Sequence, residues 1–354
     1  MSVLRSIDLR RIRCFTDQRI EATPGINLMM GANGTGKTTA LEAVFAMVHG
    51  ATFRHGRLQD MIQKNQPAGK IKLVLDRDHG APQEHTMEIH STSKKYAING
   101  ERATAADQRT NTVVVLAPQH HKIITGNKTD RQKFLDDVLA QTQSEHRATL
   151  KHHAKTLNQQ RALFKQDLSL QGYQEYARPW LAQNKLLTER IRNARNLLVQ
   201  SLLPHLSQNA YGISDGKSQI ALIYQEKNEG LSDDQLLARE FYARRILYGA
   251  QRDDLCLTHN ERSVDLFASQ GEQATFLLAL KLAEMACLEK ENKRPILLLD
   301  DLGTTLDQRR RQQLLEIIET KSTQTLITSC DPSLSQELQK SSQNMHEIRL
   351  GPSL

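Results

Sequence analysis

The chain has 354 residues, 38% hydrophobic and 25% charged, a balance that suits a globular protein with room for two domains. The formal net charge is +7, which fits a polyanionic partner but is equally common in basic proteins that have none. The arginine-rich N-terminus has no apolar signal segment, no apolar run approaches about 18 residues, and the four scattered cysteines form no C-x-x-C pair. We therefore expect a cytoplasmic protein with no membrane span, zinc site or disulfide framework.

The first part of the chain is rich in predicted strands. Hydrophobic patterning predicts four of them, over residues 3–12, 26–30, 71–75 and 86–89. One helix is predicted from Lys37, because apolar residues follow at helical spacing from Leu41 to Val48. Asn99 and Gly100 predict a hairpin turn. This part therefore has the pattern of an α/β to α+β domain.

Long polar helices are predicted in the middle of the chain. After a buried strand at residues 112–116, two helices are expected over residues 130–168 and 175–203, the second ending before Pro204. A helical pair inserted between strands is expected to project as an arm rather than join the sheet. A strand at 218–224 and a helix at 232–247 follow. The predicted division is a head formed by residues 1–125 and 246–354, with a helical arm at 126–245.

A glycine-rich loop carries the strongest functional signal. It matches G-x-x-x-x-G-K-[ST] and directly follows the strand predicted at residues 26–30. In such a loop backbone N–H groups turn towards phosphates, the Lys37 ammonium neutralises the β and γ oxygens, and the Thr38 hydroxyl is placed to ligate Mg²⁺. The positive end of the following helix adds to this. The predicted nucleotide-binding residues are Gly31, Ala32, Asn33, Gly34, Thr35, Gly36, Lys37, Thr38 and Thr39.

A second acidic element is expected to complete the nucleotide site. The apolar run at residues 296–299 is closed by Asp300 and Asp301, as in a core parallel strand that delivers carboxylates to the edge of the phosphate loop. Asp300 is then placed to hold Mg²⁺, and Asp301 to orient or deprotonate the attacking water. The alternative is a strand that merely ends in a solvated turn; the presence of Lys37 favours the functional interpretation.

A third element lies at the start of a predicted helix. Ser269, Gln270 and Gly271 precede a long apolar helical run. A serine hydroxyl and a glycine N–H at a helix N-terminus can bind an anion, but an ordinary serine N-cap explains them as well. Their position after the loop and before Asp300 matches the signature motif of ABC-type ATPases, which completes the ATP site of the opposite subunit.

In chain order, these elements resemble the RecF recombination-repair proteins, a branch of the ABC-type ATPases related to the SMC heads. The resemblance covers nearly the whole chain. It rests on residues 9–15, 24–27, 52–54, 130–136, 249, 252–254, 269–271, 279–283 and 297–301. It implies an α/β fold, namely an ABC-type P-loop ATPase head with a strand-rich N-terminal lobe and an inserted helical arm domain.

The resemblance also implies a function. RecF-like proteins are expected to dimerise on ATP and to bind the DNA phosphate backbone at single-strand gaps or junctions of single and double strand. They are expected to act with RecO and RecR to place RecA, in repair, replication and the SOS response. By this resemblance Lys37, Thr38 and Asp300 bind Mg-ATP and Asp301 serves slow hydrolysis. Ser269 and Gly271 then contact the γ-phosphate bound by the partner copy, and Asp307 is a D-loop residue at the dimer seam or a plain helix N-cap.

Several positions depart from the usual RecF pattern and indicate a divergent member. They put in doubt the hydrolysis rate, the dimer seam and the accessory partners. These positions are Gln119, Ala250, Gln251, Ala274, Thr304, Thr305 and Cys330.

No motif for reading a DNA sequence is present, so contacts to DNA would be made to phosphates. The candidate basic residues could also form a simple solvated surface. They are Arg10, Arg11, Arg13, Arg54, Arg57, Lys70, Lys72, Lys94 and Lys95.

Two other functions remain open on sequence grounds. One is a nucleotide-binding subunit of a membrane transporter, which the long arm and the basic charge disfavour. The other is a DNA-binding scaffold that does not hydrolyse ATP, suggested by Ala274 and Thr305.

Overall fold

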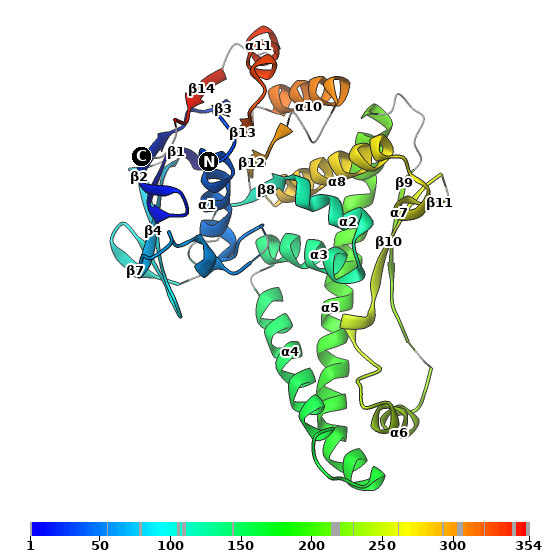
Figure 1. The fold of residues 1–354 in the computed structure, drawn as a ribbon. Coiled ribbons are helices and arrows are strands. Elements are labelled where there is room, and N and C mark those ends of the chain that lie inside the picture. The colour runs from blue at the N-terminus through cyan, green and yellow to red at the C-terminus, as the bar shows by residue number, and fades with distance from the viewer. Residues whose placement is uncertain are drawn as a thin grey trace. The chain divides into compact units, whose positions relative to one another are not determined.

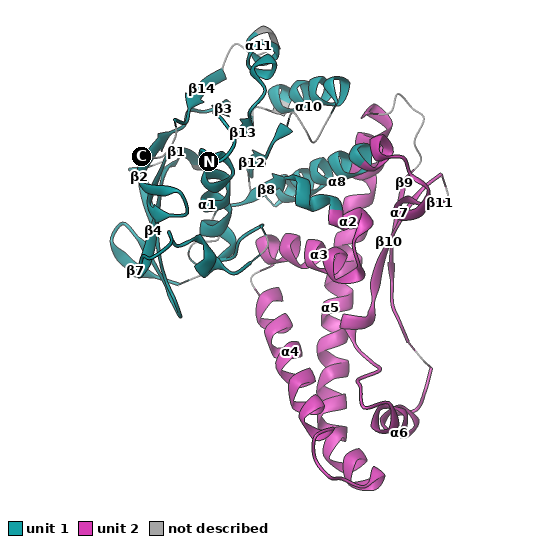
Figure 2. Cartoon of the chain, viewed as in Figure 1, with its two compact units in different colours: residues 1–121, 274–354 teal, residues 122–273 magenta. Residues whose placement is uncertain are grey.

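A computed structural model divides the chain into two compact units, residues 1–121 with 274–354 and residues 122–273 (Figure 2). It describes residues 2–54, 56–77, 80–104, 107, 111–143, 145–213, 220–228, 230–260, 262–291, 294–302, 307–321, 323–341 and 345–351. Thr304 and Thr305 lie outside these ranges. The unit boundaries differ from the predicted domain limits at 126 and 245, because residues 246–273 contribute a strand that pairs within the second unit.

The first unit contains two sheets (Figure 1). The six-stranded sheet has the order β2-β1-β4-β5-β6-β7, and all its neighbours are antiparallel. Its strands are β1 (Ser2–Ile12), β2 (Phe15–Glu21), β4 (Ala68–Arg77), β5 (Gln83–His90), β6 (Lys94–Ile98) and β7 (Glu101–Ala103). The predicted hairpin turn is confirmed, because Asn99 and Gly100 connect β6 to β7 with φ of 51° and 83°.

The five-stranded sheet is entirely parallel, with the order β14-β3-β13-β12-β8. Its strands are β3 (Ile26–Met30), β8 (Val113–Leu116), β12 (Ile296–Leu299), β13 (Thr325–Ser329) and β14 (Met345–Arg349). Strands β8 and β12 are short apolar runs, and β3 and β13 are buried along almost their whole length, which is the pattern of parallel strands covered on both faces. The prediction that residues 296–299 form a core parallel strand is confirmed.

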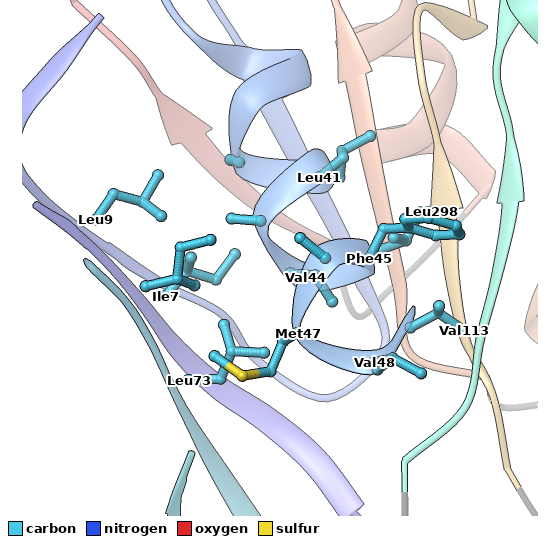
Figure 3. Close-up of a cluster of buried hydrophobic side chains, with 14 of the residues drawn as sticks. Ile7, Leu9, Leu41, Val44, Phe45, Met47, Val48, Leu73, Val113 and Leu298 are labelled. Carbon is cyan, nitrogen blue, oxygen red and sulfur yellow. The ribbon is translucent and has the colours of Figure 1, made fainter. Parts of the chain in front are cut away.

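Helix α1 (Lys37–His49) lies between the two sheets and forms the centre of the first unit (Figure 3). All its residues from Thr39 to His49 are buried. A helix that is apolar on every side must be covered on every side, here by β1 and β4 and by the parallel strands. Figure 3 shows Ile7 and Leu73 on one side of α1 and Leu298 on the other. This packing holds the start of α1 at the carboxyl end of β3.

The remaining elements of the first unit are helices. They are η1 (Leu58–Met61), η3 (Pro118–His121), α10 (Gln308–Lys321), α11 (Pro332–Ser341) and most of α8 (Gln270–Lys290), whose first turn belongs to the second unit. Helix α8 is long and almost entirely buried from Phe276 to Leu288.

The second unit consists of helices and a small antiparallel sheet of order β11-β10-β9. Its helices are α2 (Lys122–Thr125), α3 (Lys128–Thr142), α4 (His146–Leu163), α5 (Leu170–Ile213), α6 (Asp233–Ala243), α7 (Val264–Phe267) and η4 (Ala250–Arg252), and its strands are β9 (Ile220–Gln225), β10 (Asp254–His259) and β11 (Arg262–Ser263). Helices α4 and α5 pack along each other as a hairpin, and α6 packs on α5 near the turn that connects these two helices.

Two helix predictions were wrong in their limits. The helix predicted over residues 130–168 is broken into α3 and α4, because Gln143 adopts an extended conformation and ends α3. The helix predicted to stop before Pro204 continues to Ile213. A proline within a helix removes one hydrogen bond, but Leu202, Leu206 and Ala210 are fully buried on either side of it, so their packing favours continuation of the helix.

A buried ionic network joins α5 to the rest of the second unit. The carboxylate of Asp253 is fully buried and accepts two hydrogen bonds of 2.8 Å from Arg192, one of 2.8 Å from the Tyr224 hydroxyl and one of 2.9 Å from the backbone N–H of Lys227. One turn further along α5, Arg195 forms a two-pronged pair with Asp136 of α3 at 2.9 and 2.8 Å. The two arginines thus connect α3, α5, β9 and η4.

A buried carboxyl group lies where α6 packs against α4 and α5. Glu240 is fully buried and accepts hydrogen bonds from Gln160 of α4 (2.6 Å), from the Tyr173 hydroxyl of α5 (3.4 Å) and from the backbone N–H of Leu247 (2.7 Å). Burial raises the pKa of Glu240 to about 7, against which these hydrogen bonds act. The fold therefore favours the protonated form of Glu240.

The stability of the second unit is expected to fall as the pH rises from about 4.5 through about 7. Because the folded-state pKa of Glu240 lies above its ordinary value of 4.5, the folded state binds more protons in this window. The loss amounts to about 3 kcal/mol. Urea denaturation followed by the fluorescence of Trp180, the single tryptophan, measures it, because Trp180 packs on the cluster around Tyr173. Glu240→Gln should remove this component of the pH dependence, and an unchanged slope in the variant would contradict the assignment.

Candidate nucleotide-binding site

The glycine-rich loop connects β3 to α1, as predicted. Gly34 and Gly36 have φ of +87° and +92°, a region that side chains with a Cβ rarely adopt. At Gly36 a Cβ would also lie 2.2 Å from the ring of Phe15. The loop therefore needs glycine at these positions, and it brings the backbone of residues 31–36 to the N-terminus of α1.

Lys37 is the first residue of α1, and its side chain turns back over the loop. Its ammonium donates hydrogen bonds to the carbonyl oxygens of Gly31 (2.7 Å) and Ala32 (2.8 Å). Thr35 also closes the loop, through a 3.0 Å bond from its hydroxyl to the Ala32 carbonyl. Asn33 and Gly34 are exposed, whereas Thr39 is buried and belongs to the core. The loop thus presents one cation and the helix N-terminus at the same place, a combination that suits a polyphosphate.

Thr38 and Asp300 lie side by side although 262 residues separate them. The Thr38 hydroxyl donates a 2.8 Å hydrogen bond to the Asp300 carboxylate, and the Thr328 hydroxyl donates one of 2.9 Å to the same oxygen. Thr38 follows β3 through the glycine-rich loop, Asp300 directly follows β12, and Thr328 lies near the end of β13. These three strands are neighbours in the parallel sheet. Ligands bind at this carboxyl edge in open α/β sheets.

The environment of Asp300 suits a divalent cation. Its carboxylate is mostly buried, and burial raises its pKa, while the hydrogen bonds from Thr38 and Thr328 and the charge of Arg54 act the other way. A hydroxyl and a carboxylate oxygen in contact are the hard oxygen donors that Mg²⁺ prefers. The two predicted Mg²⁺ ligands therefore fit that ion.

Asp301 follows in a left-handed conformation, with φ of 52°. Its backbone N–H donates a 2.9 Å hydrogen bond to the Thr328 hydroxyl, which fixes the turn after β12. Aspartate tolerates this conformation better than most residues, and such backbone positions concentrate at functional sites. This turn fixes the backbone of Asp301, the second carboxylate residue after β12.

Sequence reasoning missed Thr328 and the contacts of Arg54 inside the fold. The β-branched segment Thr325–Ser329 ends in hydroxyl side chains, which was a signal for Thr328, but only the strand order places it beside Asp300. Arg54 was predicted as a DNA contact. Its guanidinium lies 3.9 Å from the buried carboxylate of Glu42, and its charge opposes the rise that burial causes in the pKa of Asp300.

The predicted signature residues lie in the second unit, at the start of α8. The Ser269 hydroxyl and backbone N–H both donate to one carboxylate oxygen of Glu272, at 2.7 and 2.8 Å, and the Glu272 N–H donates back to the Ser269 hydroxyl at 3.3 Å. This is the capping box of a helix N-terminus. The alternative interpretation of Ser269 as an N-cap therefore describes its geometry here, and Gln270 and Gly271 form the first turn of α8.

Comparison with known proteins identifies the family. The family model described as RecF/RecN/SMC N terminal domain matches residues 3–349. The DNA replication and repair protein RecF of Heliobacterium modesticaldum is 30% identical over 345 residues, which cover 92% of each chain. The chain belongs to the RecF family. The RecF protein of Thermosynechococcus vestitus is 31% identical, covering 92% of this chain and 90% of its own.

Solved structures agree with a RecF fold. A recombination mediator protein RecF-ATPrS of the RecFOR pathway has a TM-score of 0.82 at 21% identity, covering 98% of this chain and 96% of its own. An Smc head domain from Pyrococcus furiosus, bound to the C-terminal domain of ScpA, has a TM-score of 0.59 at 15% identity, covering 100% and 95%. The prediction of an α/β ABC-type ATPase fold is confirmed. No helix among the described residues is both long enough and apolar enough to cross a bilayer.

In this RecF family member most of the predicted DNA-contacting residues already have partners. Arg13 forms two 2.8 Å bonds with the buried carboxylate of Glu42, so it serves the fold. Others pair on the surface, as Lys70 with Glu88, Lys72 with Glu84, Arg10 with Asp17 and Arg57 with Asp60, while Lys94 bonds to the Gly50 carbonyl. Strand β5 lies between β4 and β6, so the lysines of the two strands are separated by a row that carries acidic residues. Within the described part of the chain, Arg11 and Lys95 form no ion pair and remain the clearest candidates.

Asp307 has the geometry of a helix N-cap. Its carboxylate accepts a 2.9 Å hydrogen bond from the backbone N–H of Arg310 and forms an ion pair with the Arg310 guanidinium. Arg310 in turn donates a 2.7 Å bond to the Thr275 hydroxyl. The cap and a role at a dimer seam are compatible, because an acidic N-cap stays partly exposed.

Proposed function

We propose that this protein is an ATP-dependent DNA-binding protein of recombinational repair. In this proposal ATP and Mg²⁺ bind at the glycine-rich loop, two copies of the chain then associate, and the dimer binds DNA at single-strand gaps or at junctions of single and double strand. It helps RecO and RecR partners to load recombinase in replication, repair and the SOS response. Membership of the RecF family supports the assignment. The observation that carries it is the 2.8 Å contact between Thr38 and Asp300 at the start of α1, where Lys37 bonds over the glycine-rich loop.

The roles of the residues follow from their positions. The loop N–H groups and Lys37 hold the phosphates, and Thr38 and Asp300 supply oxygen ligands. Mg²⁺, when bound, neutralises charge on the β and γ oxygens. Thr328 keeps the Asp300 carboxylate oriented, and in this proposal Asp301 orients the attacking water. ATP binding closes the dimer and slow hydrolysis releases it.

The surroundings of Ser269 support a dimer in which this residue meets the nucleotide of the other copy. Two large apolar side chains lie two and three positions before it, Phe267 with 66% and Leu266 with 75% of their surface exposed. Exposed apolar side chains next to a polar anchor are typical of association surfaces. Glu272 holds the Ser269 hydroxyl through one carboxylate oxygen, so a γ-phosphate has to displace this carboxylate to reach Ser269.

Sedimentation velocity with and without Mg-ATP, on a gapped DNA duplex, tests the proposal as a whole. We expect a monomer without nucleotide, a dimer with Mg-ATP, and co-sedimentation of the dimer with the gapped DNA. A monomer that binds gapped DNA equally well without ATP would contradict it.

Ser269→Arg is expected to prevent the ATP-induced dimer while leaving ATP binding to the monomer unchanged. The arginine is too large for the phosphate of the other copy to approach the helix N-terminus. Ser207→Arg, on the exposed side of α5, is the matched control and should dimerise normally. Normal dimerisation of Ser269→Arg by ultracentrifugation would contradict the role of this residue.

Asp301→Asn is expected to lower phosphate release by about 100-fold and to leave ATP affinity within about two-fold, because the amide cannot accept the water proton. Asp17→Asn, an exposed surface change, is the control. Equal phosphate release by wild type and Asp301→Asn would favour the DNA-binding scaffold that does not hydrolyse ATP.

A further inference from the structure

The second unit contains a pocket of about 670 Å³ that has no part in the nucleotide site. It lies against α5, between the segment that follows β9 and the segment that follows α6. Its apolar part consists of Leu231, Leu236 and Leu247, together with the ring of Tyr248. This volume lies within the range of sites that bind small molecules or several side chains of a peptide, about 300–1,000 Å³.

Both cations that line the pocket are held by acidic partners. Lys185 forms an ion pair with Asp233 at the start of α6. Arg192 is held by the buried carboxylate of Asp253 at 2.8 Å and lies 3.4 Å from Glu226. The two cations also lie near the face of the Tyr248 ring, at 5.9 and 5.4 Å from its centre. Both cations are therefore already neutralised by carboxylates and do not favour an anionic ligand.

The pocket has more carboxylates than cations. Glu189 is exposed, and within the described chain no side chain forms an ion pair or hydrogen bond with its carboxylate. Glu226 accepts a 3.0 Å hydrogen bond from the Asn196 amide and shares Arg192 with Asp253. Among the described residues, the charges that line the pocket or pair with its lining are thus two cations and four carboxylates, namely Glu189, Glu226, Asp233 and Asp253, in a chain whose overall charge is positive.

Amide groups complete the lining. Asn193 and Asn228 lie at the pocket, and the Asn228 oxygen accepts a 2.8 Å bond from Arg192, which leaves its NH₂ group to donate. Side-chain amides can pair with both groups of a peptide backbone. An apolar floor, acidic groups at the edge and amides able to bind a backbone together define the chemistry of the ligand.

We propose that this pocket docks a protein partner through a segment in which an arginine or lysine stands next to a large apolar residue. The apolar side chain lies on Leu231, Leu236 and Leu247, and the cation lies against Glu189 and Glu226. Phosphate groups are repelled by the same carboxylates, so the pocket takes a peptide rather than DNA. The docking does not depend on ATP and adds a protein-binding surface to the second unit.

Selection from a random dodecapeptide library displayed on phage, against the immobilised full chain, tests this proposal. The selected peptides should carry arginine or lysine within two residues of leucine, isoleucine or phenylalanine. In fluorescence anisotropy, their affinity should fall at least ten-fold for Glu189→Lys and about three-fold for Glu226→Gln. Glu175→Lys, 14 positions earlier on the same helix and about 21 Å away, is the matched control and should bind as the wild type.

Three outcomes would overturn the proposal. The first is no enrichment over the Glu189→Lys protein, and the second is enrichment of acidic peptides. The third is an affinity that Glu189→Lys and Glu175→Lys change equally. Circular dichroism and ATP binding of each variant show that it is folded, and the mild Glu226→Gln change keeps the test valid if Glu189→Lys is unstable.

Discussion

Lys37→Ala is expected to lower the affinity for Mg-ATP at least about 100-fold, or about 2.7 kcal/mol, and to abolish ATP-dependent retention on gapped DNA. The change removes the only side-chain cation that the loop itself contributes, one that bonds to the carbonyls of Gly31 and Ala32 in this structure. Without it the phosphates keep the backbone N–H groups and the helix end but lose their counter-charge. Equilibrium titration with a fluorescent ATP analogue measures the first effect, and a gel shift with and without ATP measures the second.

The matched control for this change is Lys95→Ala, an exposed lysine of β6 that forms no ion pair within the described residues. It should bind ATP as the wild type does. Because Lys95 is also one of the two clearest candidates for a DNA contact, a modest loss of DNA affinity at unchanged ATP affinity is expected for this variant. Retention of Lys37→Ala on gapped DNA at the wild-type level in the presence of ATP would overturn the assignment of the site.

Asp253→Ala is expected to destabilise the second unit by about 3–5 kcal/mol, because it removes the buried counter-charge of the Arg192 guanidinium and leaves only the partly exposed Glu226 at 3.4 Å. Arg192 has only 6% of its side chain exposed, and Asp253 supplies two of its three acceptor oxygens at 2.8 Å, the third being the neutral amide of Asn228. The Tyr224 hydroxyl and the Lys227 N–H lose an acceptor as well. Urea denaturation followed by Trp180 fluorescence reports the effect, since this single tryptophan lies on α5.

Asp234→Ala provides the control for this prediction. Asp234 pairs with Arg178 on the surface, where both side chains are more than half exposed, so its removal should cost about 0–1 kcal/mol. A difference of less than about 1 kcal/mol between the two variants would show that solvent reaches Arg192 and compensates its charge. A decrease confined to Asp253→Ala would establish the network as the main connection between α5 and the small sheet.

Some parts of the candidate site could be predicted from the sequence and others could not. The loop from Gly31 to Thr39 is a local pattern, in which glycines, lysine and threonine stand at fixed spacing, so its position between β3 and α1 followed from the sequence. Asp300 also followed, because an apolar run that ends in acids is typical of a core parallel strand. Its contact with Thr328 did not follow, because it depends on the order of strands in the sheet, which brings β13 between β3 and β12.

Basic residues were the least predictable class. Arg13 was expected to contact DNA, but the tertiary structure pairs it with Glu42, a fully buried residue of α1. Charge in the sequence does not show which carboxylate will be desolvated and in need of a partner. The continuation of α5 past Pro204 has a similar cause, since the local cost of the proline is known from sequence and the compensating burial of Leu202 and Leu206 is not.

The sequence by itself determined the phosphate loop, the acidic end of β12, the helical character of the middle of the chain and, through the order of its motifs, the RecF family. These features depend on residue types at short spacing along the chain. Local backbone geometry and hydrophobic periodicity are therefore enough to predict them. Only the tertiary structure decided that the hydroxyls of Thr38 and Thr328 donate to the same oxygen of Asp300, and that Asp253 and Glu240 are buried. Those contacts join residues 262, 80 or 61 positions apart, or depend on desolvation, and long-range packing alone determines both.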